Sequence, residues 1–92
     1  RQRRQNMPKE QAVWEKAKPL KGRDPDNVRQ DPYGKEIHRR QYGQDTKHGW
    51  EIDHITPKSR GGSDHIRNLQ ALQTDTNRTK GDSLVKKSRH NQ

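Results

Sequence analysis

The large apolar residues of this chain are few, and most of them fall inside one stretch. Leu, Ile, Val and Phe together make up 11 of the 92 residues, a composition that borders on that of disordered proteins. A chain this short also buries only a limited fraction of its surface, so its core has to be small. Residues 50–72 contain six large apolar side chains: Trp50, Ile52, Ile55, Ile66, Leu69 and Leu72. We therefore expect one compact core made by this stretch, with mobile ends.

The charge of the chain predicts a polyanionic partner. The 21 Lys and Arg residues outnumber the 12 Asp and Glu residues by nine, and the isoelectric point is near 10.3. Clustered Lys and Arg gain affinity for phosphate backbones by releasing counterions, so nucleic acid is the expected partner. We expect no membrane partner, because no apolar run approaches the roughly 20 residues of a membrane span. The absence of Cys excludes disulfides and Cys-rich zinc sites, which leaves oxygen and nitrogen as the metal ligands.

The first 20 residues are expected to form a basic arm and one short helix. Residues 1–6 are polar and basic, and Asn6 is suited to cap a helix over residues 7–18, which Pro19 would end. The helix has a one-sided apolar stripe that includes Trp14. Helical spacing of this kind is usually core, so we expect Trp14 to dock the helix onto the domain rather than to stack on bases.

The segment that follows this helix is expected to be mostly loop. Residues 21–32 are charged and rich in turn formers, and Val28 is the one residue there that we expect to face inward. A turn at Gly34 precedes a short strand over residues 35–39, with Ile37 buried and basic side chains outside.

A strand, a loop, a second strand and a helix are expected next. Residues 50–53 alternate between apolar and charged, which favours a strand, and residues 69–72 are suited to return as its antiparallel partner. The intervening residues 58–64 contain a Gly pair that permits a tight reversal. The helix would follow, with Thr74 or Asp75 as its N-cap.

Four polar residues that could take part in catalysis or metal binding lie in order on these elements. Asp53 and His54 are adjacent, Asn68 follows, and Asn77 lies in a Lys/Arg-rich segment. Neighbours in a regular strand point to opposite faces, so we expect the backbone to leave ladder geometry at the Asp53–His54 pair, as Pro57 would encourage. Each residue taken by itself has a plain structural alternative: a surface histidine, a loop carboxylate or a capping amide.

Taken together, this pattern resembles the HNH nuclease family. It is most similar to members whose last motif position is Asn rather than His, as in the HNH domain of the RNA-guided CRISPR nuclease. The likeness covers about a third of the chain. It implies an α+β fold with a small ββα-metal core, in which a two-stranded antiparallel hairpin with a long loop is followed by a helix. We expect this domain over residues 21–86, after the arm and helix of residues 1–20 and before a mobile tail at residues 87–92.

The motif supplies candidates for each part of phosphodiester hydrolysis. His54 is suited to be the general base, because the pKa of imidazole ordinarily lies near physiological pH. Asp53 and Asn77 are the expected metal ligands, and their hard oxygens favour Mg²⁺ or Mn²⁺ over tightly held Zn²⁺. By resemblance, Asn68 ties the connecting loop through backbone hydrogen bonds and so orients the ring of His54.

Other charged and imidazole side chains receive simpler interpretations. Basic residues that flank the motif are expected to grip phosphates without reading bases: Arg60, Arg67, Arg78 and Lys80. We expect His65 to be a solvated loop residue, with contact to substrate as the alternative. His38, His48 and His90 have no spacing that implies a ligand set.

The sequence thus predicts a metal-dependent endonuclease that cuts DNA with little sequence specificity, without excluding RNA. The family leaves 5′-phosphate and 3′-hydroxyl ends. One alternative is a non-catalytic basic nucleic-acid-binding module. Another concerns the role, since similar HNH domains act as phage or restriction endonucleases and as toxin effectors neutralised by an immunity protein. Because the chain begins with Arg rather than Met, we interpret it as part of a longer protein, expected in the cytoplasm or delivered into a target cell's cytoplasm.

Overall fold

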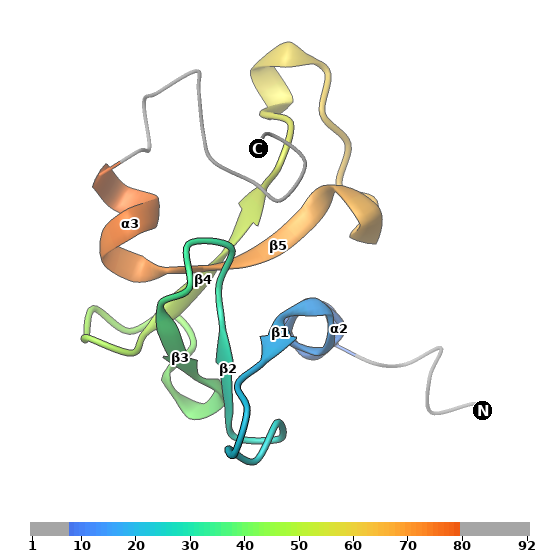
Figure 1. Cartoon of the computed structure of the whole chain (residues 1–92). Helices are drawn as coiled ribbons and strands as arrows, with labels where there is room; N and C mark the ends of the chain where they lie inside the picture. The colour runs from blue at the N-terminus through green and yellow to red at the C-terminus, as the bar shows by residue number, and fades with distance from the viewer. Residues whose placement is uncertain (1–7, 80–92) are drawn as a thin grey trace, which may run out of the picture.

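The computed structural model describes residues 8–79. In chain order the helices and strands are α2 (Lys9–Lys16), β1 (Lys18–Pro19), β2 (Val28–Gln30), β3 (Glu36–His38), β4 (Trp50–His54), β5 (Leu69–Gln73) and α3 (Thr74–Thr79) (Figure 1). Strands β1, β2 and β3 form one antiparallel sheet, and β4 and β5 form a second. The sequence β4, β5, α3 is a hairpin followed by a helix, so the predicted α+β fold with a ββα core is confirmed. No helix within residues 8–79 is long and apolar enough to cross a membrane.

Helix α2 is shorter than predicted. It begins after Pro8 and ends at Lys16, where Ala17 adopts extended backbone and donates its N–H to the carbonyl of Trp14. The chain then pairs as β1 with β2 instead of continuing as helix to residue 18. The predicted arm and the Asn6 cap lie outside the described residues. Trp14 is 1% exposed, which confirms that it docks the helix onto the domain.

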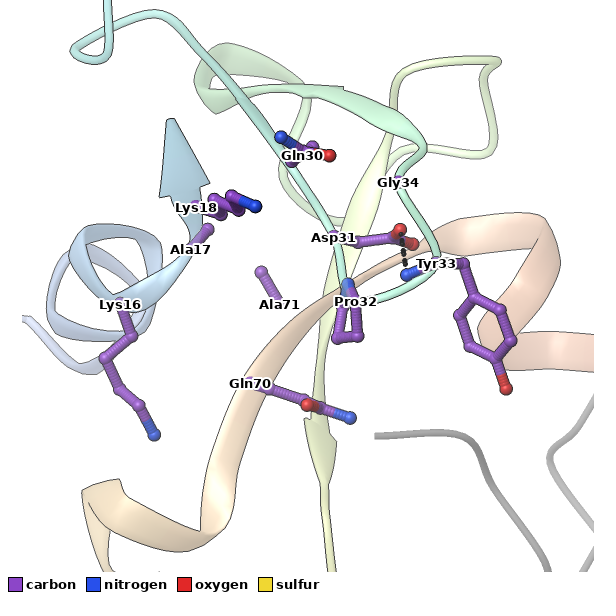
Figure 2. Close-up of a pocket in the computed structure, with 10 residues that line it drawn as sticks. All are labelled: Lys16, Ala17, Lys18, Gln30, Asp31, Pro32, Tyr33, Gly34, Gln70 and Ala71. Atoms are coloured by element: carbon purple, nitrogen blue, oxygen red, sulfur yellow. Dashed lines mark hydrogen bonds between the residues drawn. The ribbon is translucent and has the colours of Figure 1, made fainter. Parts of the chain in front are cut away.

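The loop predicted over residues 21–32 is wrong in part, because β2 lies within it. The strand has a single buried apolar residue, Val28, and pairs with both β1 and β3. After β2 the buried carboxylate of Asp31 organises the turn. Its Oδ1 accepts a hydrogen bond of 2.9 Å from the backbone N–H of Tyr33 (Figure 2) and a second, also of 2.9 Å, from the N–H of the later residue Lys35. Its second oxygen accepts from the N–H of Gln73 at 2.9 Å. Asp31 therefore fastens the first sheet to the end of β5.

The core joins both sheets and helix α2. It contains Val13, Trp14, Ile37, Trp50, Leu69 and Ala71, with Ala17 and Ile52 packed against it. The rings of Trp14 and Trp50 lie 5.3 Å apart, and each indole N–H donates to a backbone carbonyl. The predicted burial of Ile66 is wrong, since this residue lies in a single 3₁₀ turn and is 36% exposed. Ile66 was expected to contribute to the core. Helix α2 packs against β5 and contributes Val13 and Trp14 to it.

The β4–β5 ladder is regular through its last pair. Asp53 pairs with Gln70, and His54 pairs with Leu69. The N–H of Ile55 also donates to the carbonyl of Asn68 at 2.8 Å, which extends the pairing past His54. The predicted departure from ladder geometry at Asp53 and His54 is therefore wrong. Pro57 lies too far along the chain to end the strand there.

Helix α3 follows β5 without a connecting loop. Its first residue is Thr74, and the side-chain oxygen of Gln73 accepts a hydrogen bond from the N–H of Thr76 at 3.0 Å. The predicted N-cap, Thr74 or Asp75, is therefore wrong, because this capping bond comes from Gln73. The hydroxyl of Thr74 instead donates to the carbonyl of Gln44 at 2.9 Å, which ties the helix to the loop before β4.

Candidate active site

Asp53 is a buried carboxylate on the face of β4 that also carries Glu51. Side chains two residues apart on a strand share a face. Asp53 is 3% exposed, and its Oδ2 accepts a hydrogen bond of 3.0 Å from the amide of Gln70 on β5. Burial of a charged group is costly unless polar groups compensate for it, so this contact helps to hold the carboxylate in place.

Asn77 on helix α3 contacts the same face of β4. Its Nδ2 donates to Oε1 of Glu51 at 2.8 Å. An ionised carboxylate only accepts hydrogen bonds, so this contact fixes which end of the amide faces Glu51. The oxygen of Asn77 is then the atom of that amide left for a metal. Glu51 was not singled out from the sequence, although its position two residues before Asp53 is the signal that could have found it.

His54 contacts a carboxylate in the loop that connects the two strands of the hairpin. Its Nε2 lies 2.7 Å from Oδ1 of Asp64, and Lys58 lies 3.3 Å from the other oxygen. The hydrogen bond from His54, and then Lys58, hold the pKa of Asp64 below its ordinary value of 3.8. Because the ionised carboxylate only accepts, Nε2 of His54 carries a hydrogen and the lone pair of the neutral ring lies on Nδ1. Asp64 was not predicted, since nothing in its loop spacing indicates this contact.

Asn68 joins the two ends of that loop with three side-chain hydrogen bonds. Its oxygen accepts from the N–H of Thr56 at 2.9 Å, and its nitrogen donates to the carbonyls of Thr56 at 3.1 Å and Ser63 at 2.7 Å. Ser63 immediately precedes Asp64. Asn68 thus fixes the backbone beside Asp64, the carboxylate that contacts the imidazole of His54.

Two glycines allow the loop to fold back on itself. Gly61 has φ of +88°, in the left-handed region that favours glycine. A Cβ on Gly62 would lie 1.8 Å from the carbonyl oxygen of Thr56, closer than any real contact. The predicted tight reversal at this Gly pair is confirmed, and the second glycine is required by close packing of the backbone.

The predicted phosphate contacts are distributed over the loop and helix α3. Arg60 and Arg67 are exposed, and Lys80 lies outside the described residues. Arg78 is also exposed but forms ion pairs with Asp45 at 3.3 Å and with Glu51 at 3.6 Å, so a phosphate would compete with two carboxylates for it. Roles in nucleic-acid binding remain predictions for all four residues.

Two other histidines form an unexpected cluster with a carboxylate. Glu36, His38 and His48 each offer a ligand atom, and these atoms lie within 4.8 Å of one another. His38 and His48 were not expected to belong to a ligand set, and their positions in the structure would allow them to hold a metal together with Glu36. The hydrogen bond from His38, and then Arg23 and His48, lower the pKa of Glu36, although burial opposes them. The spacing of these residues in the sequence does not predict the cluster, because the segment between β3 and β4 brings them together in the fold.

His65 is exposed, as predicted, and accepts a hydrogen bond from the N–H of Arg67.

A hollow of about 470 Å³ lies beside the candidate site. It is lined in part by Lys16 on α2, Tyr33 after β2, and Gln70 and Ala71 on β5 (Figure 2). Gln70 connects the two features, since its side chain lines the hollow and its amide donates to Asp53.

Comparison with known families identifies the fold and the motif together. Residues 34–83 match the family model described as HNH endonuclease, a span that includes β3, β4, β5, α3 and the four motif residues. The match covers more than half of the chain. This protein belongs to the HNH endonuclease family. Searches of curated proteins and of solved structures return no match. Membership indicates nuclease-type chemistry on nucleic acid. The β4–β5 hairpin and helix α3 are the elements that carry the motif in this HNH protein.

Proposed function

We propose that this protein is a divalent-metal-dependent endonuclease that hydrolyses DNA phosphodiester bonds with little sequence specificity. The observation that carries the proposal is the hydrogen bond between Asn77 and Glu51. It brings the last motif residue onto the same face of β4 as Asp53, the first. Residues far apart in the sequence thereby offer oxygen ligands on one side of the hairpin.

The donor set on that face fits a hard divalent ion. Asp53 and Asn77 offer a carboxylate oxygen and an amide oxygen, and Glu51 adds a second carboxylate beside them. Mg²⁺ and Mn²⁺ prefer such oxygens, and Mg²⁺ keeps several waters in its shell. A bound ion would supply positive charge beside the scissile phosphate. Glu51 orients the amide of Asn77 and supplements the negative charge of the site.

His54 acts as the general base in this mechanism. The hydrogen on its Nε2 is donated to Asp64, so Nδ1 is the atom that accepts a proton from the attacking water. Asp64 keeps the ring in this tautomer and favours the positive charge that develops on it. In this arrangement His54 takes the proton and Asp64 orients the imidazole, as the carboxylate does in a Ser-His-Asp triad.

Plasmid cleavage tests the proposal. Supercoiled DNA is incubated with the protein in Mg²⁺, in Mn²⁺ and in EDTA, with structured RNA as a parallel substrate. We expect nicking and linearisation in either metal, and none in EDTA. His54→Ala should bind DNA but not cut it, whereas His65→Ala, which changes an exposed histidine outside the motif, should cut normally. Binding without cleavage by the native protein in every metal would identify it as a non-catalytic nucleic-acid-binding module.

A further inference from the structure

A second set of metal-ligating side chains lies at the opposite end of β4 from His54. Glu36 and His38 come from β3, and His48 comes from the turn before β4. All three side chains are partly buried, at 28–30% exposure. Two imidazoles and one carboxylate are a ligand set that Zn²⁺ uses in proteins.

The hydrogen bonds of His48 determine where its lone pair lies. Its Nδ1 is 3.2 Å from the backbone carbonyl oxygen of Glu36. A carbonyl only accepts, so Nδ1 carries the hydrogen and the lone pair of the neutral ring is on Nε2. That Nε2 lies 4.0 Å from Oε2 of Glu36. A lone pair and a carboxylate oxygen repel each other unless a cation lies between them.

His38 approaches the same carboxylate oxygen. Its Nε2 is 2.5 Å from Oε2 of Glu36. The rings of His38 and His48 are stacked, with centroids 4.1 Å apart and planes 11° from parallel. Without a metal, Nε2 of His38 donates its hydrogen to Glu36. One divalent ion in place of that hydrogen can accept a lone pair from each ring and bind the carboxylate while both rings stay neutral.

We propose that Glu36, His38 and His48 bind one Zn²⁺ ion, or a similar transition-metal ion, with water as the fourth ligand. Ligand atoms of a tetrahedral zinc site lie about 3.3 Å apart, so the contacts of 2.5 and 4.0 Å would each change by less than about 1 Å. Arg23 donates to Oε1 of Glu36 at 3.2 Å, and the backbone holds Nδ1 of His48. Such outer hydrogen bonds orient ligands in metal sites.

The ion would serve as a structural link. It joins β3 to the turn before β4, where the N–H of His38 already donates to the carbonyl of His48 at 2.9 Å. A small chain without Cys has few other means of fastening distant segments, and a metal that binds only the folded state stabilises it. This proposal does not depend on nuclease activity, because the cluster shares no residue with the candidate active site.

Metal binding and thermal melting of the untagged full chain test the proposal. After EDTA treatment, dialysis against Zn²⁺ should load one ion per chain, and excess Mg²⁺ should not displace it because Mg²⁺ prefers oxygen ligands. At 100 times the dissociation constant, Zn²⁺ should raise the melting temperature by roughly 10–20 °C. A native protein that binds no Zn²⁺ would overturn the proposal.

Substitutions locate the ion. His38→Ala and His48→Ala should lose the bound Zn²⁺ and its effect on melting, whereas His65→Ala and His54→Ala should keep both. Glu36→Gln retains the size of the side chain without its charge and should bind at least tenfold more weakly. If the alanine variants do not fold, the visible spectrum of Co²⁺ in the native protein and in Glu36→Gln provides the same comparison. Equal metal binding by the native protein and His48→Ala, or loss of the ion in His54→Ala, would refute the assignment.

Discussion

Replacing Asn68 by Ala should destabilise the protein through one loop. The change removes three hydrogen bonds of 2.7–3.1 Å that join the backbone of Thr56 to that of Ser63. Such bonds contribute about 0.5–1.5 kcal/mol each, and those near solvent fall in the lower half of that range. We therefore expect a loss of about 1.5–3 kcal/mol. In a domain of this size the melting temperature should fall by on the order of 10 °C.

Two further variants show whether the loss arises from these bonds. Asn68→Asp retains an oxygen that accepts from the N–H of Thr56, but its other oxygen would face the carbonyls of Thr56 and Ser63. At pH 7 it should be at least as destabilising as alanine. Asn27→Ala is the matched control, because Asn27 makes one exposed side-chain bond, to Asp24. Its effect should stay within about 0.5 kcal/mol.

Urea unfolding and plasmid nicking measure the two consequences separately. The midpoint and slope of each unfolding curve give the free energy of unfolding. Cleavage at a temperature where both proteins are folded should still be slower in Asn68→Ala, because the backbone beside Asp64 is no longer fixed. A stability loss below about 0.5 kcal/mol, or normal cleavage by the folded variant, would refute this account of Asn68.

Four other outcomes follow from the contacts of the site. His54→Ala should lose on the order of 10²–10⁴ in cleavage rate with DNA affinity nearly unchanged, as filter binding and nicking would show. Asn77→Ala should cut poorly and recover only in part at high metal, whereas Asn77→His should shift the preference from Mg²⁺ toward Mn²⁺ or Co²⁺; identical metal profiles in all three proteins would contradict its role as a ligand. The folded pKa of Asp64 is depressed, so its pair with His54 stabilises the protein above pH 3.8 and is lost as pH falls further; melting curves of the native protein and Asp64→Asn should converge there. Gly62→Ala should unfold or rearrange the loop, because the new Cβ would meet the carbonyl of Thr56, and circular dichroism melts would detect the loss.

The sequence predicted the elements whose signals are local. Alternation of apolar and charged residues around Ile52 marks β4, and the Gly pair marks the reversal between the strands. The strand around Ile37 was found in the same way. These patterns depend on neighbours within a few positions, so they can be recognised from the sequence alone.

The rest depends on contacts between distant segments. Strand β2 has one buried apolar residue, and its strand structure comes from pairing with β1 and β3 rather than from its own composition. The burial of Asp31 depends on the N–H of Gln73, 42 residues further along the chain. Ile66 lies exposed in a 3₁₀ turn, while Trp14 of helix α2 belongs to the core. No local pattern predicts these outcomes.

The candidate site also combines residues that the sequence predicts with contacts that only the fold provides. The motif order predicts that Asp53, His54 and Asn77 are the reactive residues, but the groups that orient them come from the fold. Glu51 fixes the direction of the Asn77 amide, and Asp64 fixes the tautomer of His54. A base and a ligand are useful only when the correct atom faces the substrate, so substitutions of Glu51 and Asp64 should change catalysis although neither belongs to the motif.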